Sequence, residues 1–398
     1  MPRLTSISVT NYRAFAEEVR LELRPLTLLY GLNNVGKSTL VRLPAIIADS
    51  TLESAEGPLN LYGEAGRGAS FRALLYDTER RTFDLKLTWD DGLHAHYRMR
   101  LGDDELGAIV MLVVQGHDGS KHAWVAPQEA TPDLPLGAVR DGGQQFIGLL
   151  PQGPEPLWTR LRDNLRGLRG QTRWLGALRQ RPQPYTERRL RPLKGDGEGA
   201  LETLLLRPEL LQEVDNWLQA AMNRTLRAQE VQGGRSRWLL PPLDDALRDL
   251  DLQDAGEGVL QVIPVLTALA LRRDRKPHQH PILALEEPTT HLHDDLQIQL
   301  TKRFCAAAME QDPITLVIET HSRPVLLAVQ VALASGDLTP DKVILYWVEQ
   351  GSAGSSRVTP VTFSKQGRPE SDLLMHIFTD QPELTRQLAR RWMERRAP

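Results

Sequence analysis

The sequence predicts an α/β fold with a β-rich first lobe, a helical insert and an α/β C-terminal lobe. Three observations support this prediction. Short segments up to about residue 127 alternate apolar and polar residues, as half-buried antiparallel strands do. The pattern of residues 157–250 is mainly helical, and from about residue 254 apolar strand-like runs alternate with helical ones. The expected boundaries are therefore 1–127 for the first lobe, 128–250 for a linker and helical insert, and 251–398 for the last lobe.

Length and composition narrow the class of protein. The chain has 398 residues, enough for two or three lobes that each bury a core. Its 48 Lys and Arg nearly balance 51 Asp and Glu, so overall charge does not by itself indicate a nucleic-acid partner. No apolar run approaches the ~18–20 residues of a membrane span, and the first residues lack the apolar core of a signal peptide. We therefore expect a cytoplasmic protein with no membrane partner, and the single Cys305 as a small core residue rather than a disulfide or zinc ligand.

The individual elements can be placed in order along the chain. In the first lobe, strands are expected within 4–12, 19–31, 82–90, 94–101, 108–116 and 121–127. One helix near Lys37–Ala48 interrupts them, and residues 128–156 are rich in Pro and Gly, which favours a linker. In the last lobe, strands are expected within 281–288, 314–320, 343–350 and 358–363, and a helix over 295–310.

A phosphate-binding loop is the most specific motif in the sequence. The segment Gly31-Leu-Asn-Asn-Val-Gly36-Lys37-Ser38 matches G-x-x-x-x-G-K-[ST], follows an apolar strand and opens a helix. Glycines let several backbone N–H groups face phosphates at a helix N-terminus, whereas Lys37 can reach the β/γ-phosphates and Ser38 can join a Mg²⁺ shell. The alternative is a chance Gly-rich turn. We predict an ATP and Mg²⁺ site whose loop residues are Gly31, Asn33, Asn34, Gly36, Lys37, Ser38 and Thr39.

Two further strands end in groups that suit nucleotide hydrolysis. The run PILALEEP ends with Glu286, expected to hold a Mg²⁺-bound water, and Glu287, expected to orient or deprotonate the attacking water. The run ITLVIETHS brings His321 to the next strand end, where it can donate to the γ-phosphate or the water. The alternatives are a solvated Glu pair at a helix start and a structural histidine.

These three motifs, in this order, resemble the ABC-type ATPase heads of the SMC, RecF and OLD (overcoming lysogenisation defect) group. The chain is similar above all to stand-alone OLD-like AAA ATPases. Further similar segments are Asn11–Phe15 after the first strand, Trp174–Arg179 followed by Asp196–Gly199, and the signature-like Asp254–Gln261. The resemblance covers most of the chain. No Glu and paired Asp set after Thr320 resembles the nuclease domain of larger OLD proteins, so we expect no nuclease.

The resemblance implies an ABC-type P-loop ATPase head with slow, Mg²⁺-dependent ATP hydrolysis. It implies that Arg13 contacts the bound nucleotide, and that Gly256 and Gly258 read the nucleotide of a second copy in an ATP-driven homodimer. A separately encoded effector and a role in bacterial anti-phage defence or DNA maintenance follow from the same resemblance. Leu260 and Thr289 depart from the family pattern, which favours the alternative of an ATP-locked DNA-binding clamp or scaffold with little turnover.

Weaker features have competing interpretations. Ten arginines lie between Arg160 and Arg191, a density that suits DNA or RNA phosphates. The alternatives are a solvated helical face or a protein-docking surface, and Arg179 is also a candidate contact to nucleotide or to the partner subunit. His291 and His293 are interpreted as a subunit-contact loop rather than a metal pair.

Overall fold

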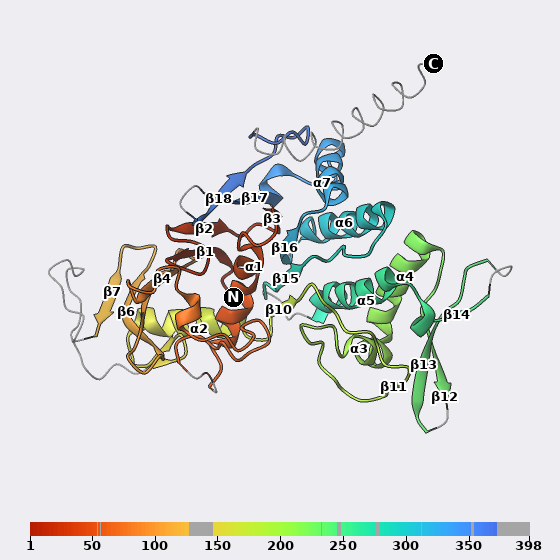
Figure 1. Cartoon of the computed structure of the whole chain (residues 1–398), viewed down its shortest axis with the longest axis horizontal. Helices are drawn as coiled ribbons and strands as arrows, with labels where there is room; N and C mark the ends of the chain where they lie inside the picture. The colour runs from red at the N-terminus through yellow and green to blue at the C-terminus, as the bar shows by residue number, and fades with distance from the viewer. Residues whose placement is uncertain are drawn as a thin grey trace, which may run out of the picture.

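The computed structural model describes residues 1–53, 55, 57–126, 146–231, 233–244, 248–274, 279–311, 313–351 and 354–371. A central sheet is flanked on one side by a second large sheet and on the other by a group of helices (Figure 1). The predicted mixed α/β fold is therefore confirmed.

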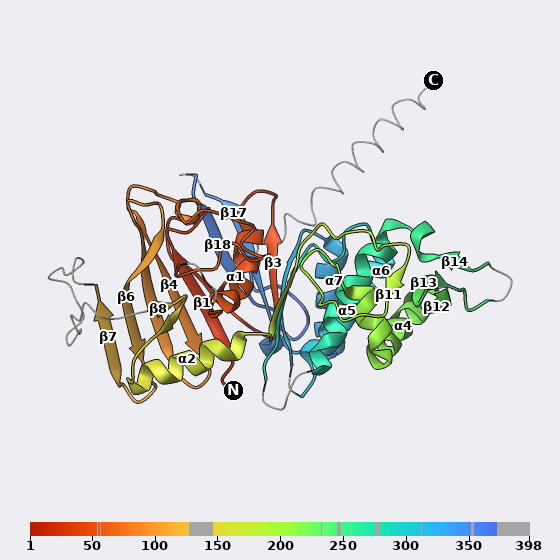
Figure 2. The same ribbon diagram turned by 90° about the horizontal axis from the view of Figure 1, so that it is seen from below.

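The first lobe is built on an antiparallel sheet of strand order β2-β1-β4-β5-β6-β7. Its strands are β1 (Leu4–Thr10), β2 (Val19–Glu22), β4 (Thr82–Trp89), β5 (His94–Leu101), β6 (Gly107–Gln115) and β7 (Lys121–Val125). In β4 every second residue is buried. The alternation of apolar and polar residues in the sequence therefore reflects a sheet that packs one face against the core. Helix α2 (Pro156–Leu168) runs along this sheet and buries Trp158 and Leu161 in the same core (Figure 2).

The central sheet has the order β10-β15-β16-β3-β17-β18. Its strands are β3 (Leu26–Gly31), β10 (Thr172–Leu175), β15 (Ile282–Glu286), β16 (Thr315–Thr320), β17 (Val343–Gln350) and β18 (Ser356–Val361). All neighbours are parallel except β17 and β18. Strands β3, β15 and β16 are buried along their whole length, which explains their continuous apolar runs.

Two hydrophobic cores cover the two faces of the central sheet. Helix α1 (Lys37–Asp49) and the first-lobe sheet share a core with one face, to which Ala284 and Val317 belong. The other face packs against α5 (Glu257–Ala270), α6 (Asp294–Ala308) and α7 (Arg323–Ser335). Strand β16 lies between β3 and β15, so the carboxyl ends of all three strands meet at one edge beside α1.

The middle of the chain differs from its predicted helical character. Helices α3 (Ala200–Leu206) and α4 (Pro208–Met222) are present, but so are strands, namely β11 (Thr186–Glu187), β12 (Arg227–Val231), β13 (Arg235–Leu240) and β14 (Leu250–Asp251). Strand β10 joins the central sheet, and α2 packs on the first lobe. The expectation of a mainly helical segment over 157–250 is therefore met by α2, α3 and α4 but missed the strands, because pairing and packing rather than local pattern specify these short strands. Residues 128–145 of the expected linker lie outside the described part, and the hairpin β8 (Phe146–Ile147) and β9 (Leu150–Pro151) follows them.

Two expectations from composition concern single features. Cys305 is buried on α6 within the second core, as expected. Within the ranges that the structure describes, no helix combines the length and apolar character of a membrane span.

Candidate nucleotide site

The phosphate loop leaves the end of β3 and is fixed on two sides. A Cβ on Gly31 would lie 2.0 Å from the carbonyl oxygen of Val348 on the neighbouring strand, so only glycine fits. Gly36 has φ 96°, and a Cβ there would meet the ring of Phe15 at 2.8 Å. The loop therefore passes between β17 and the turn that contains Phe15, and α1 begins at Lys37.

The turn Asn11–Phe15 brings Arg13 to the side of this loop. Tyr12 and Phe15 exchange backbone hydrogen bonds of 2.8 and 2.9 Å, and the backbone N–H of Arg13 donates to Leu74 at 2.7 Å. Arg13 itself has φ 54°, in the left-handed region. The contact of Phe15 with Gly36 shows that the turn and the phosphate loop are packed as one unit, which places Arg13 near the loop.

Lys37 is buried at the base of the loop. Its Nζ donates to the carbonyl oxygens of Gly31 at 3.0 Å and Leu32 at 2.6 Å, and lies 4.0 Å from Oε1 of Glu319. Burial lowers the pKa of Lys37, while the nearby Glu319 opposes that shift. In contrast, Leu32 and the adjoining Asn33 and Asn34 are exposed at the tip of the loop.

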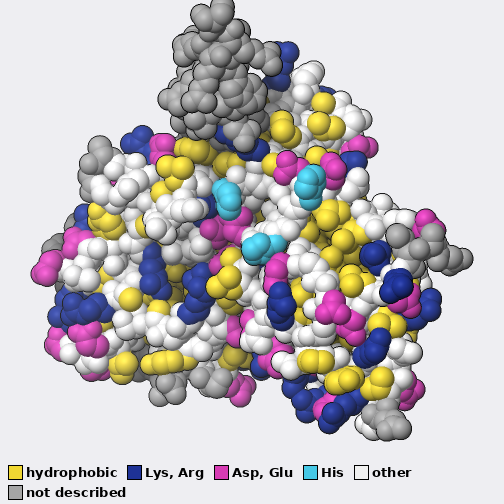
Figure 3. Space-filling model, turned by 45° about the vertical axis from the view of Figure 1, so that its right-hand side comes forward, with side chains coloured by type: hydrophobic (Ala, Val, Ile, Leu, Met, Phe, Trp, Pro, Cys, Tyr) yellow, Lys and Arg dark blue, Asp and Glu magenta, His cyan; other side chains and the backbone are white. Residues whose placement is uncertain are grey.

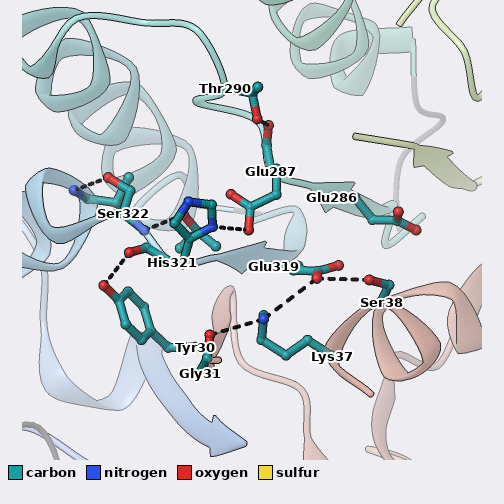
Figure 4. Close-up of polar contacts among 12 residues, drawn as sticks. Tyr30, Gly31, Lys37, Ser38, Glu286, Glu287, Thr290, Glu319, His321 and Ser322 are labelled. Atoms are coloured by element: carbon teal, nitrogen blue, oxygen red, sulfur yellow. Dashed lines mark hydrogen bonds and ion pairs between the residues drawn. The ribbon is translucent and has the colours of Figure 1, made fainter. Parts of the chain in front are cut away.

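Glu287 and His321 lie together at the strand edge (Figure 4). Nδ1 of His321 is 2.8 Å from Oε1 of Glu287. Glu287 has φ 44°, and its backbone N–H donates to Glu319 at 3.0 Å, which turns its side chain away from the strand. Tyr30 donates its hydroxyl to the carbonyl oxygen of His321 at 2.5 Å. The His321 side chain is 65% exposed and the Glu287 side chain 16%, so the histidine faces solvent while most of the Glu287 side chain is covered.

Glu286 has a different environment from the one expected. Its carboxylate accepts hydrogen bonds from Nε and Nη2 of Arg42 at 2.5 and 2.9 Å, and from Nε1 of Trp174 at 2.9 Å. Arg67 approaches it at 3.7 Å, and the guanidinium carbons of Arg42 and Arg67 lie 5.7 and 5.4 Å from the centroid of the Trp174 ring. The structure therefore places the Glu286 carboxylate among arginines, and its metal role stays a prediction.

Glu319 is the residue that sequence reasoning missed. It lies on β16 opposite Glu286 in the strand register, and its Oε1 accepts the hydrogen bond that the Ser38 hydroxyl donates at 2.8 Å. Burial raises the pKa of Glu319 to about 7. A signal was present in the sequence, because Glu319 is the only charged residue in the apolar strand ITLVIET and stands two residues before His321.

The signature-like segment opens α5, with Gly256 as the N-cap residue and Glu257 as the first helical residue. Leu260 is 2% exposed and packs in the second core, so its side chain faces the interior of its own chain. Gly256 is exposed, and a Cβ there would meet nothing within 4 Å. The start of α5 is thus open to solvent through Gly256 but not through Leu260.

Arg179 connects α5 to the end of β15. Its Nη2 donates to the carbonyl oxygen of Glu286 at 2.9 Å, and Nε2 of Gln261 donates to the Arg179 carbonyl oxygen at 2.9 Å. Burial lowers the pKa of Arg179 to about 10, so it stays charged at neutral pH. The expectation that Arg179 contacts nucleotide or a partner subunit is corrected, because the buried side chain binds its own chain.

The arginines between Arg160 and Arg191 do not form one surface. Arg160 pairs with Asp91 of the first lobe at 2.9 Å, Arg181 pairs with Glu257, and Arg191 pairs with Glu198 at 2.8 Å. Because α2 packs on the first lobe and α3 lies beside α5, the segment is divided between the two sides of the molecule (Figure 1). The density of arginines in the sequence does not become one patch in space, and a DNA or RNA contact through this segment stays a prediction.

The histidines of the loop after β15 are exposed. His293 lies 4.0 Å from Asp295, and its side chain is 82% exposed. No group of three or more His, Cys, Asp or Glu that could hold a metal ion occurs within the described ranges. Figure 3 shows exposed histidines beside acidic side chains near the middle of one face, with basic and hydrophobic side chains around them.

Comparison with known proteins agrees with this architecture. Residues 225–328 match a domain family described as "AAA domain, putative AbiEii toxin, Type IV TA system". No curated protein matches the sequence. Residues 225–328, which begin after the phosphate loop, are therefore similar to an AAA domain family.

Two solved structures resemble the whole fold. One is an SMC head bound to the C-winged helix domain of ScpA, with 9% identity, a TM-score of 0.50, and coverage of 92% of this chain and 99% of that one. The other is an Smc head with an extended coiled coil bound to the C-terminal domain of ScpA, derived from Pyrococcus furiosus, with 11% identity, a TM-score of 0.51, and coverage of 91% and 97%. The fold is that of an ABC-type P-loop ATPase head, as the sequence predicted.

Proposed function

We propose that this protein is a slow, Mg²⁺-dependent ATPase of the ABC type that pairs with a second copy on ATP. The observation that carries the proposal is the meeting of Lys37 and Ser38 with the Glu287–His321 pair at one sheet edge. These groups come from three adjacent parallel strands and the helix after the first of them, and each has chemistry that suits phosphoryl transfer to water.

The residues divide the reaction between binding and proton transfer. The loop N–H groups and Lys37 bind the β/γ-phosphates, which replace the carbonyl contacts that Lys37 makes without ligand. Glu287, with Oε1 on His321, uses Oε2 to orient the water and receive its proton. His321 donates Nδ1–H to Glu287, and in its doubly protonated form it also donates from Nε2 to the γ-phosphate. The Ser38 hydroxyl and the acidic groups beside it suit Mg²⁺, which neutralises charge on the phosphate oxygens when bound.

Phosphate release and nucleotide binding, measured together, test this assignment. Lys37→Ala removes a charge-assisted contact to the phosphates, so we expect a loss on the order of 1.5–3 kcal/mol in binding of a fluorescent ATP analogue. Lys302→Ala, the same change at an exposed position on α6 away from the loop, serves as the matched control. Equal affinities of Lys37→Ala and wild type for the ATP analogue would contradict the assignment of this segment as a phosphate-binding loop.

A second candidate function is an ATP-locked clamp or scaffold that binds DNA with little turnover. The observation that favours it is Leu260, which has no hydroxyl and is buried in its own chain, so its side chain gives no contact to the nucleotide of a facing copy. Steady-state phosphate release with and without DNA separates the two functions. Turnover that responds to DNA supports the ATPase, and tight binding without measurable turnover supports the clamp.

A separately encoded effector completes the proposal. Both similar SMC heads are bound to a domain of ScpA in their solved structures, and the matched domain family is described in terms of a toxin of a Type IV TA system. These descriptions support a head that controls a second protein, in anti-phage defence or DNA maintenance. Purification of the chain with the products of adjacent genes, with and without ATP, tests whether such a partner binds.

A further inference from the structure

Two carboxylates occupy matching places on neighbouring strands of the nucleotide site. Glu286 on β15 and Glu319 on β16 are direct partners in the parallel register. The residues two positions earlier, Ala284 and Val317, both belong to the core on the α1 side of the sheet, so both acids point to that side. The two carboxylates differ in their hydrogen-bond partners, and this difference indicates which of them is available to a metal ion.

Both oxygens of Glu286 are already bound by side-chain donors of its own chain. Arg42 binds both of its oxygens in a two-pronged contact, and Trp174 donates to one of them. With Arg67 at 3.7 Å as well, its negative charge is balanced by two guanidinium groups. Paired contacts of this kind are among the strong hydrogen bonds in proteins, so a metal would have to break them.

Glu319 has the complementary arrangement. Its Oε1 accepts from the Ser38 hydroxyl, the group expected in the Mg²⁺ shell, and its Oε2 is buried with no hydrogen-bond partner. The residue is only 7% exposed. A buried carboxylate oxygen without a partner is costly and calls for an explanation.

A nucleotide-bound Mg²⁺ supplies that explanation. Mg²⁺ in such sites is held by one or two carboxylates together with phosphate oxygens and waters, rather than by a cage of protein ligands. We propose that Glu319, and not Glu286, supplies the carboxylate that faces the Mg²⁺ of bound ATP, and that Glu286 acts as the counter-ion of Arg42. The inference rests on the proposed function, because it assumes that ATP occupies the phosphate loop.

The Mg²⁺ dependence of nucleotide binding tests this inference without reference to turnover. Affinity for a fluorescent ATP analogue is measured in EDTA and across a Mg²⁺ titration, for wild type, Glu319→Gln and the matched variant Glu286→Gln. We expect Glu319→Gln to lose about 10–100-fold of the Mg²⁺-dependent gain in affinity, with little change in EDTA. Glu319→Asp, which keeps a carboxylate, should recover part of that gain. Glu286→Gln should keep the full gain but melt at a lower temperature, because Arg42 loses its partner.

The bound metal is also observed directly. With Mn²⁺ and the ATP analogue, electron paramagnetic resonance should show weaker metal binding in Glu319→Gln than in wild type. The inference would be overturned if Glu286→Gln lost the Mg²⁺-dependent increase in affinity while Glu319→Gln kept all of it. The inference would also be overturned if Glu319→Gln bound the ATP analogue more tightly in EDTA and its affinity still rose by the wild-type factor with Mg²⁺. That result would mean that the Glu319 carboxylate repels the phosphates. Wild type that binds no nucleotide under either condition would instead overturn the proposed function, and the inference with it.

Discussion

At the scale of single residues, the contact between Glu287 and His321 separates chemistry from binding. The two side chains meet each other beyond the phosphate loop, whereas Lys37 and Ser38 lie within it. Loss of the Glu287 carboxylate should therefore affect the water and leave the phosphate contacts in place. The left-handed backbone at Glu287 gives this side chain a direction different from that of Glu286, so the two adjacent acids contact different partners.

We predict that Glu287→Gln lowers the rate of phosphate release about 10²–10⁴-fold, because an amide cannot accept the proton of the attacking water. Binding of the ATP analogue should stay within a few-fold of wild type. Single-turnover assays with radiolabelled ATP measure both quantities, and Glu18→Gln on the surface of the first lobe is a control. Wild-type turnover in Glu287→Gln would mean that another group is the base.

The raised pKa of Glu319 has a consequence for stability. Its pKa is about 7 in the folded protein and near 4.5 in the unfolded chain, so the carboxylate is harder to ionise when folded. The favourable contribution to stability is complete below about pH 4.5 and is lost as the pH rises through about 7. Without ligand, we predict that Glu319→Gln raises Tm by a few degrees at pH 8 and has a smaller effect at pH 5. Thermal melts of both proteins at the two pH values measure this, and an equal effect at both would contradict the shifted pKa.

At the scale of elements, Arg179 joins the signature-like helix to the acidic strand end. It binds the last residue of β15 through its side chain and α5 through its backbone, while it is almost fully buried. The neighbouring Arg181 also reaches α5, through Glu257, but its side chain is 63% exposed. Two arginines in one segment therefore offer a matched comparison of a buried and an exposed contact.

We predict that Arg179→Met lowers the free energy of unfolding by about 1.5–3 kcal/mol, the range for hydrogen bonds to charged groups. Arg181→Met should cost about 1 kcal/mol or less, because an exposed ion pair contributes little. Urea denaturation of both variants gives the two values. Equal losses would mean that Arg179 does not hold α5 to β15.

The elements also show how far the sequence predicts the site. Strands with strict alternation or continuous apolar runs were placed well, and the meeting of Glu287 with His321 follows from two parallel strands that end at one edge. Glu319 was missed because its importance depends on strand order. Strand β16 lies between β3 and β15, which puts its acid nearest Ser38, and no local period encodes that order. The pairing of Glu286 with Arg42 depends on the packing of α1 on β15, which no local sequence pattern predicts either.

At the scale of the whole molecule, the phosphate loop and the start of α5 belong to different sides of the central sheet. Helix α1 follows the loop on the first-lobe side, and α5 packs with α6 and α7 on the other side (Figure 2). In the proposed ATP-bound pair, the phosphates in the loop of one copy would face the N-terminus of α5 in the second, where the helix dipole favours negative charge. Pairing about a two-fold axis uses both surfaces twice.

The two glycines at the start of α5 are unequal as places to test this pairing. A Cβ on Gly258 would lie 2.6 Å from the carbonyl oxygen of His291 in its own chain. A larger residue there would therefore disturb the fold of the single chain, whether or not a second copy binds. A Cβ on Gly256 meets open space, and its φ of −62° suits any residue. An arginine at Gly256 therefore alters the surface and leaves the chain beneath it intact.

We predict that Glu287→Gln with ATP and Mg²⁺ forms a species of twice the 44.7 kDa of one chain, and that it stays monomeric with ADP or without nucleotide. Addition of Gly256→Arg should abolish the dimer, because the side chain occupies the place of the facing phosphates. Leu106→Arg, at an exposed position just before β6, is the matched control and should leave the dimer intact. Light scattering measures the mass, and binding of the ATP analogue confirms that each variant still takes nucleotide. A dimer that persists without nucleotide would point to a constitutive interface elsewhere, whereas a dimer that survives Gly256→Arg would show that the start of α5 does not face the partner.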